Sequence, residues 1–331
     1  MTREPDATST IPPASRCLVL GGAGFLGGHI AEVLHARGIA VRIFDRVARR
    51  GDLDSSIEWM EGDFGNRGDL SAAVAGCDTA VHLAATTLPK TSNDDPVHDL
   101  ESNLLPSVRF LDVARDGGIR RVVFASSGGT VYGIPDRTPV PETHPTRPIC
   151  SYGIHKLAIE QYLHLYHHLH GLEYCVLRLA NPFGERQRTD ASQGAVAVFL
   201  DKALKNDVIT VWGDGSVVRD YVYVGDVARA FHLAITRREP SGTFNIGSGQ
   251  GVSILELLAA IERLLGRPVG RRFVPARAFD VPTSVLDTTQ AARVLGWSPT
   301  VSFDVGLRRM LDYLCPSRLQ SAVRSSGSES T

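Results

Sequence analysis

The sequence predicts a doubly wound α/β fold, in which helices cover both faces of a parallel sheet, with a smaller, interleaved α/β lobe. Up to Pro182, short apolar segments alternate with amphipathic helical segments, which is the order that crossover helices give to parallel strands. The chain has 331 residues, and 43% of them are hydrophobic, so it can bury a large core.

The predicted elements of the first part follow one another regularly. A buried strand, CLVL, leads through a glycine-rich turn into a helix, and the strand AVRIFD follows. Further apolar strands then alternate with helices of increasing length. In chain order, the strands are expected at 17–20, 40–45, 57–63, 79–85, 120–127 and 173–180, and the helices at 29–38, 70–76, 97–116 and 151–171.

After Pro182 the rhythm changes, because loops lengthen and helical and extended segments come in mixed order. We therefore expect residues 16–181, joined by part of 219–248, to form the first domain. Residues 182–316 are expected to form mainly a second, discontinuous lobe. The polar, small-residue segments 1–15 and 317–331 are predicted to be a disordered leader and tail.

The composition excludes several classes of protein. The net charge is −1, which gives no electrostatic footprint for nucleic acid or an anionic membrane. No apolar run reaches the ~18 residues of a membrane span, and the leader lacks the apolar stretch of a secretory signal. The five cysteines are scattered without a CxxC, which argues against a disulfide framework or zinc site and suits the cytoplasm.

A metal site is not expected. His164 and His168 are a helical i,i+4 pair within a run that also contains His167 and His170, but no nearby carboxylate or cysteine completes a ligand set. A surface run of histidines is the preferred interpretation.

The turn GGAGFLGGHI carries the first functional signal. Gly21, Gly24 and Gly27 fit G-x-x-G-x-x-G, and Gly22 with the last two fits G-x-G-x-x-G. Glycines let the backbone approach a pyrophosphate, to which the helix N-terminus presents free N–H groups. This strand–turn–helix context predicts a Rossmann-type dinucleotide site.

Asp45 ends the second strand, near the offset of the acid that binds ribose hydroxyls. A carboxylate there repels a 2′-phosphate, so NAD is predicted as the cofactor, and neighbouring Arg46 keeps NADP as the alternative. Arg46, Arg49 and Arg50 cluster locally. We interpret them as a solvated loop, with a phosphate contact as the alternative.

Tyr152 and Lys156 in SYGIHK lie four apart on a predicted helix, hence on one face. A tyrosine of ordinary pKa ~10 is a poor base at neutral pH. A lysine ammonium nearby, together with a nicotinamide cation, favours the phenolate and makes the pair a candidate for proton transfer.

From about Cys17 to Pro316 the chain resembles the extended short-chain dehydrogenase/reductase family, in its nucleotide-sugar epimerase/dehydratase branch, with the UDP-glucose 4-epimerases as the most similar group. The motifs that carry the resemblance are GGAGFLG, EGDF, HLAA, SSGGTVYG, YGIHK, RLANPFG, GDGSVVRDYVYVGDV, NIGSG, and RAFDVP ahead of LGWSP. The resemblance implies an NAD-binding first domain and a substrate-binding second lobe. It also implies a nucleotide-sugar substrate and a homodimer formed through the 97–116 and 151–170 helices, with a place in galactose metabolism or polysaccharide precursor supply.

The resemblance also assigns residues to the site. Catalysis is assigned to Tyr152 and Lys156. The cofactor-binding residues that it implies are Gly21, Gly24, Phe25, Leu26, Gly27, Asp45, Asp63, Phe64, Leu83, Ala84, Ala85, Asn103, Ser126, Tyr152 and Lys156.

The stretch FASSGGTVYGIP corresponds to the floor of the family's active site, and it is altered here. Family members place a serine or threonine where this chain has Gly128, and that hydroxyl binds the reacting sugar hydroxyl. We expect Ser127 or Thr130, with Ser126 or a water, to replace it. The family's 4,6-dehydratases carry an Asp-Glu pair in place of Gly129 and Thr130, and its decarboxylases keep a glutamate at the threonine. Neither acid is present, which favours epimerisation.

The substrate side follows the resemblance as well. Arg219 and Arg277 match residues that bind the diphosphate, although Arg219 could pair instead with Asp220 or Asp226. Phe199 and Trp212 either line the uracil end or pack in the core. Ser284 replaces a bulky tyrosine of galactose-specific relatives, which predicts room for the N-acetyl group of UDP-GlcNAc or UDP-GalNAc. The substrate-binding set that results is Asn181, Phe199, Trp212, Arg219, Arg277, Asp280 and Ser284.

The function expected is therefore inversion of C4 of a UDP-hexose through a transient 4-keto sugar. A dehydratase or net reductase of the same family is the enzymatic alternative, and consumption of the cofactor would distinguish a reductase. A catalytically silent nucleotide sensor is the alternative of another class, motivated by Gly128. The presence of Tyr152 and Lys156 argues against a sensor, which needs no proton shuttle.

Overall fold

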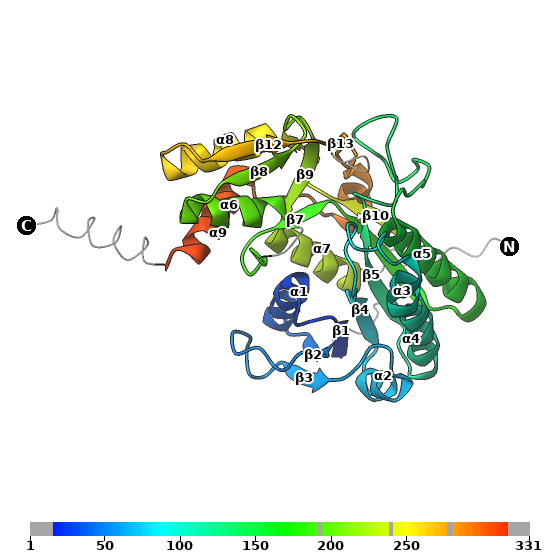
Figure 1. Cartoon of the computed structure of the whole chain (residues 1–331). Helices are drawn as coiled ribbons and strands as arrows, with labels where there is room; N and C mark the ends of the chain where they lie inside the picture. Colours follow the sequence, from blue (N-terminus) through cyan, green and yellow to red (C-terminus); the bar gives the residue numbers. More distant parts are fainter. Residues whose placement is uncertain (1–15, 191–193, 238–240, 277–280, 317–331) are drawn as a thin grey trace, which may run out of the picture.

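The computed structural model describes residues 16–190, 194–237, 241–276 and 281–316. Its larger part is built on a seven-stranded sheet in which all neighbouring strands are parallel, in the order β10-β6-β5-β4-β1-β2-β3 (Figure 1). The predicted doubly wound fold is confirmed. The strands are β1 (Arg16–Leu20), β2 (Ala40–Asp45), β3 (Glu58–Glu61), β4 (Thr79–His82), β5 (Arg121–Ser127), β6 (Glu173–Leu179) and β10 (Gly242–Ile246).

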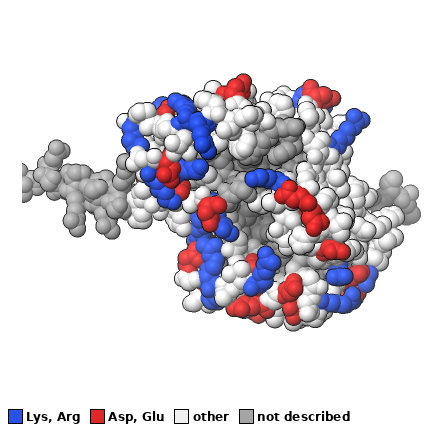
Figure 2. All heavy atoms as spheres, in the orientation of Figure 1, with Lys and Arg blue, Asp and Glu red and all other residues white. Residues whose placement is uncertain are grey.

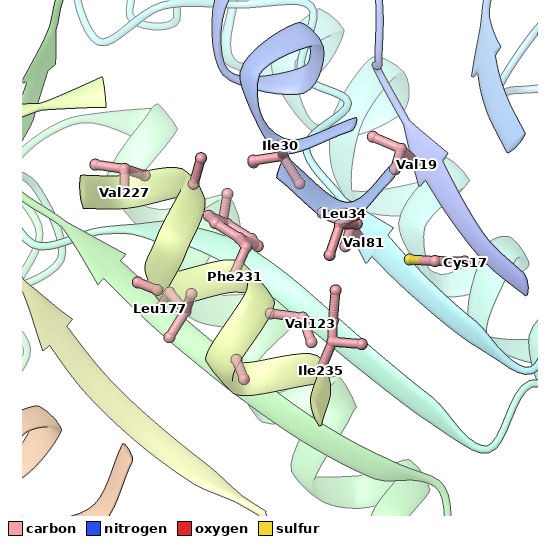
Figure 3. Close-up of a cluster of buried hydrophobic side chains, with 14 of the residues drawn as sticks. Cys17, Val19, Ile30, Leu34, Val81, Val123, Leu177, Val227, Phe231 and Ile235 are labelled. Atoms are coloured by element: carbon pink, nitrogen blue, oxygen red, sulfur yellow. The ribbon is translucent and has the colours of Figure 1, made fainter. Parts of the chain in front are cut away.

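Helices cover both faces of this sheet. On one face, α1 (Phe25–Ala36) and α7 (Val224–Thr236) bury side chains such as Leu34 and Phe231 against the strands (Figure 3). The opposite face is covered by α2 (Arg67–Val74), α4 (Leu105–Asp116) and α5 (Ser151–His170). The central strands β1, β4 and β5 are largely buried between these layers, which explains their hydrophobic runs in the sequence, whereas the edge strand β3 has exposed glutamates at both ends.

Two predicted helices differ from the observed ones. The first helix begins at Phe25 rather than at 29, because the glycine turn ends there. The segment expected as one helix at 97–116 consists of α3 (Pro96–Asp99), a π-helical turn (Leu100–Leu104) and α4. A π-turn of this kind often accompanies a functional site.

After the first strands of the smaller lobe, the chain returns to the large sheet with α7 and β10. Strand β10 pairs with β6 in parallel register, and α7 packs against α1. This segment therefore places residues beyond 220 in the core of the first unit.

The smaller lobe contains short strands and three helices. Strand β9 (Val218–Tyr223) pairs with β7 (Asn181–Phe183), β11 (Gly251–Ser253) and β13 (Thr283–Ser284), and β8 (Ile209–Trp212) pairs with β12 (Arg271–Val274). They pack with α6, α8 and α9 around a separate core, and a second π-turn returns toward the large sheet. The helical bounds are α6 (Ala195–Lys205), α8 (Ile254–Leu265), the π-turn (Ala291–Leu295) and α9 (Phe303–Leu314).

The surface carries both charges. Figure 2 shows Lys and Arg interspersed with Asp and Glu over the face in view, in keeping with the net charge of −1. Among the described helices, none has the length and apolar character needed to span a bilayer.

Candidate active site

A cavity of about 690 Å³ lies where the carboxyl ends of β4, β5 and β6 face the smaller lobe. This edge of a doubly wound sheet is where ligands bind in such folds. The first turn of α1 and the start of α5 contribute from one unit, and β8, β9 and α6 contribute from the other. The residues of the two predicted site halves therefore meet in one space.

The glycine turn fits a dinucleotide. Gly21 has φ +81°, and a side chain there would lie 2.9 Å from the backbone N of Ala84. A side chain at Gly27 would lie 2.5 Å from the Gly21 carbonyl oxygen, so the third glycine lets α1 pack against the turn. The N-cap of α1 is Gly24, without a side-chain cap or acidic residue in the first turn. The positive end of this helix is thus free of side chains that would compete with a pyrophosphate.

Asp45 lies beside this turn. Its carboxylate accepts hydrogen bonds from the backbone N–H of Ala23 at 3.0 Å and of Val47 at 3.2 Å. The carboxylate is therefore fixed next to the turn, with lone pairs left to accept from ribose hydroxyls. Arg50 donates to the Ala23 carbonyl at 3.0 Å and to Asp52, and Arg49 donates to the Ile57 carbonyl at 2.9 Å. These two arginines hold a loop around the turn.

The other predicted cofactor residues differ in their surroundings. Phe25, Leu26, Leu83 and Ala85 line the cavity, whereas Ala84 lies against Gly21. Asp63 accepts from the Gly65 N–H at 2.8 Å in a local turn, and Phe64 packs on the rings of His82 and Phe110. Asn103 is buried and accepts from the Thr86 N–H at 2.8 Å. Its side chain therefore braces the loop that follows β4.

Tyr152 and Lys156 line the cavity from one face of α5, as their spacing predicts. The Lys156 Nζ lies 5.5 Å from the centre of the Tyr152 ring and donates to the Ala125 carbonyl at 2.9 Å. The start of α5 is also fixed, because the Tyr152 N–H donates to the Ser92 hydroxyl at 3.0 Å. The pair is thus anchored to β5 and to the loop after β4.

Burial changes the acidity of both side chains. It lowers the pKa of Lys156 to about 8, an effect that the nearby Glu160 and Asp99 carboxylates oppose. Burial raises the pKa of Tyr152 above its usual value, and Cys150 and Asp99 act in the same direction. Burial thus disfavours the Tyr152 phenolate, whereas a cation close to the ring favours it.

Gly128 follows the end of β5 and lies close to the core. A side chain at this position would lie 2.5 Å from Leu286 Cδ1 and 3.2 Å from the Arg178 carbonyl oxygen, so it would point into the core. Gly128 is not among the described residues that line the cavity, so the view that a hydroxyl is missing there stays a prediction. Ser127, one residue earlier, lines the cavity instead.

The two other hydroxyls of this stretch have different environments. Ser126 lines the cavity, but its hydroxyl donates to the buried carboxylate of Glu160. The Thr130 hydroxyl oxygen is buried without a hydrogen-bond partner among the described residues, and Thr130 is not part of the cavity lining. Ser127 is therefore the hydroxyl of this stretch that is best placed to meet a ligand.

The second lobe brings four of the predicted substrate residues to the cavity, namely Asn181, Phe199, Trp212 and Arg219. Trp212 is 43% exposed, so its ring faces the cavity mouth rather than the core. The carboxylates that might have paired with Arg219 have other hydrogen-bond donors. Asp220 accepts from Ser248 at 2.6 Å, and Asp226 accepts from Arg229 at 2.8 Å.

Ser284 is buried in the small sheet beside Arg219. It is 5% exposed, pairs with Arg219 across β13 and β9, and is not among the residues that line the cavity. Arg277 and Asp280 fall outside the described residues.

The cavity also has cations that sequence reasoning missed. Lys90, Arg188 and Lys202 line it together with Lys156 and Arg219, while no described carboxylate does. Loop and helix lysines carry no motif, so no local signal could have singled them out. The result is a site with positive charge suited to a diphosphate.

Within the described ranges, no group of three metal-ligating side chains comes together, and the histidine run of α5 forms no such cluster.

Comparison with known proteins agrees with this geometry. Residues 17–247 match the model of the NAD dependent epimerase/dehydratase family, and the chain belongs to this family. NAD is accordingly the cofactor, as predicted from Asp45.

Several similar proteins within this family are UDP-glucose 4-epimerases. The UDP-glucose 4-epimerase of Mycolicibacterium smegmatis is 37% identical over 307 residues, which cover 90% of this chain and 98% of that protein. The structure of the Thermotoga maritima UDP-glucose 4-epimerase with UDP-glucose has a TM-score of 0.87 and 33% identity, covering 92% of this chain and 99% of the other. The Thermus thermophilus UDP-glucose 4-epimerase, solved with NAD, has a TM-score of 0.85 and 37% identity, covering 90% and 98%.

Proposed function

We propose that this chain is an NAD-dependent epimerase that inverts C4 of a nucleotide-diphosphate hexose. The observation that carries the proposal is the common cavity. Tyr152, Lys156 and Ser127 line it together with the first turn of α1, Phe199, Trp212 and Arg219. A proton-transfer pair, a dinucleotide turn and a cationic site for a diphosphate thus share one space.

Bound NAD supplies the acceptor and donor of the C4 hydride, and the residues of the chain handle the proton and the orientation of the sugar. The Tyr152 phenolate takes the proton from the C4 hydroxyl while the hydride leaves C4, giving the 4-keto sugar. After the sugar presents its other face, the hydride returns and Tyr152 gives the proton back. The cycle consumes no oxidant or reductant, because the hydride and the proton that leave the sugar are both returned to it.

Lys156 has an electrostatic role in this scheme. Its ammonium lies near the Tyr152 ring and favours the phenolate that burial disfavours. Ser127 is proposed to hydrogen-bond the reacting hydroxyl, because it faces the cavity at the end of β5. Thr130, whose hydroxyl is buried away from the lining, is the less suitable of the two predicted replacements.

The substrate proposed is UDP-glucose or UDP-galactose. The ring of Trp212 and that of Phe199 supply apolar faces for a base, and Arg219, Arg188 and Lys202 supply positive charge for the diphosphate. Acceptance of UDP-GlcNAc or UDP-GalNAc stays a prediction from the sequence.

The test is an NMR assay with UDP-glucose and then UDP-GlcNAc, without added reductant, in which the anomeric protons are followed. Epimerisation gives a product of unchanged mass that reaches equilibrium with the substrate. Loss of water or oxidation of added NADH would identify a dehydratase or a reductase instead. Binding of UDP-glucose without any new anomeric signal would support the sensor.

We also propose a homodimer formed through α4 and α5, which pack side by side (Figure 1). Apolar side chains on these helices are exposed, among them Leu105 at 48%, Leu165 at 42% and Leu169 at 59%. Light scattering after gel filtration should give twice the mass of the chain. The Leu165→Glu/Leu169→Glu variant should give the monomer mass, and a wild-type monomer would contradict the proposal.

A further inference from the structure

The buried residues behind Tyr152 form a hydrogen-bonded group centred on Asp99. Asp99 and His155 are both 0% exposed, and His155 Nδ1 lies 2.8 Å from the Asp99 Oδ2. The same oxygen accepts from the Ser151 hydroxyl at 2.7 Å, and the other carboxylate oxygen accepts from the Thr87 hydroxyl and from Asn103 Nδ2 at 3.3 Å. One carboxylate therefore ties together the loop after β4, the π-turn and the start of α5.

The His155 ring stands beside Tyr152. The two ring centres are 5.0 Å apart with an angle of 70° between the planes, an edge-to-face contact. Lys156 Nζ lies 5.5 Å from the centre of the same tyrosine ring. Tyr152 is thus in contact with the group centred on Asp99 through His155, and with β5 through Lys156, which donates to the Ala125 carbonyl.

The hydrogen bonds define the state of the histidine. Nδ1 faces a carboxylate and donates to it, and Nε2 is buried without a partner among the described residues. Burial, together with the charge of Lys156, lowers the pKa of His155, and the hydrogen bond to Asp99 opposes this shift. The pKa of Tyr152 is raised by Cys150 and Asp99, and the pKa of His155 is affected by Lys156 and Asp99. His82 on β4 is also close enough for its own pKa to be lowered by Lys156 and His155.

We infer that His155, oriented by Asp99, is a positioning residue that fixes the Tyr152 phenol relative to Lys156. The inference rests on the proposed function of Tyr152 in proton transfer. The imidazole ring fills the space between the Asp99 carboxylate and the phenol ring. Its edge limits the tilt of the tyrosine ring, so the hydroxyl stays within the influence of the Lys156 ammonium.

The test compares the pH dependence of kcat for the NAD-loaded wild type, His155→Ala and Asp99→Asn. In His155→Ala the phenol loses its alignment with Lys156. We expect kcat to fall by on the order of tenfold to a hundredfold with little change in KM, and the acidic limb of the profile to move to higher pH. In Asp99→Asn the negative charge that raises the pKa of Tyr152 is gone, so the acidic limb should move to lower pH.

Two further variants separate the contributions. His155→Phe keeps a ring beside Tyr152 and should retain most of kcat, whereas His155→Asn keeps a donor for Asp99 without the ring and should behave like His155→Ala. Exposed His168 lies on the same helix, and His168→Ala is the control that should match the wild type.

Unchanged kcat and an unmoved acidic limb in His155→Ala would overturn the inference, as would a loss of kcat with an unmoved limb, since that is what a purely structural role predicts. If His155→Ala does not fold, the contrast between His155→Phe, which keeps the ring, and His155→Asn, which lacks it, decides in the same way. Tyr152→Phe is assayed alongside. Full activity in that variant would overturn the proposed function itself, which distinguishes the two failures.

Discussion

Arg178 and Glu160 form a buried ion pair close to the face of α5 that lines the cavity. The Arg178 guanidinium donates to the two carboxylate oxygens at 2.6 Å and 3.0 Å, and the residues are 6% and 4% exposed. Glu160 also accepts from the Ser126 hydroxyl, and it follows Lys156 by one helical turn. The carboxylate therefore supports both the floor of the cavity and the charge of Lys156.

Glu160→Gln should destabilise the fold, because it leaves the buried Arg178 guanidinium without its counter-charge. We expect a loss of about 3–5 kcal/mol in the free energy of unfolding, measured by urea denaturation. The partly exposed pair between Lys205 and Asp201, at 2.8 Å, supplies the control. Asp201→Asn should change the unfolding free energy by less than about 1 kcal/mol. Equal effects of the two variants would contradict the structural role given to Glu160.

Tyr152→Phe should lower kcat by on the order of 10²- to 10⁴-fold, because it removes the group that we propose exchanges the proton with the C4 hydroxyl. The measurement is the rate of change of the anomeric NMR signals, with NAD content verified by release on denaturation. Tyr162 on the same helix is 36% exposed, and Tyr162→Phe should match the wild type. A Tyr152→Phe enzyme of normal rate would exclude this tyrosine as the proton carrier.

Lys156→Met should make the pH dependence of stability flatter. Burial lowers the pKa of Lys156 from 10.5 to about 8, so between these pH values the unfolded chain binds the proton that the folded chain has released. Stability rises with pH wherever the unfolded state binds more protons. The wild type should accordingly gain stability from pH 8 to 10 relative to the variant. A constant difference between the two proteins over this range would show that Lys156 is not desolvated in solution.

Gly128→Ser is expected to destabilise the protein without adding a hydroxyl to the site. The new Cβ would lie 2.5 Å from Leu286 Cδ1, so the core must shift to accept it. The melting temperature should fall. When Leu286 is first replaced by alanine, which makes room for the new side chain, adding Gly128→Ser should lower the melting temperature by less than it does in the wild type. By contrast, Ser127→Ala should lower kcat with little change in stability. A faster enzyme after Gly128→Ser would support the view that a hydroxyl is missing at that position.

The parts of the site differ in how well the sequence alone predicts them. The glycine turn and the Tyr152–Lys156 face depend on neighbours within one turn or one helix, so their spacing, together with their place in the order of strands and helices, could be recognised in the sequence. The direction of Gly128 depends on Leu286, more than 150 residues later, and the Arg178 partner of Glu160 lies on the next strand. The side-chain directions at the end of β5 are set by such long-range packing, which no local pattern encodes. For the same reason the Asp99 group and the cation Lys90 had no signal in the sequence.

Arg186 provides a last test, since it connects the two units beside the cofactor turn. It follows β7 with φ +64°, and its guanidinium donates to Glu32 of α1 at 2.6 Å and 2.8 Å and lies 3.1 Å from Asp52. Asp52 in turn binds Arg50, which donates to the carbonyl of Ala23 in the glycine turn. A left-handed conformation at a residue other than glycine is strained, so surrounding contacts must hold it.

Because this network spans both units around the glycine turn, Arg186→Ala should speed the release of NAD. We expect several-fold faster loss of the nucleotide, followed by absorbance at 260 nm after repeated gel filtration. Raised salt should speed release from the wild type more than from the variant, because the ion pairs are partly exposed. Exposed Lys205, which pairs only locally with Asp201, gives the control Lys205→Ala. If Arg186→Ala retains NAD as the wild type does, the network does not contribute to holding the cofactor.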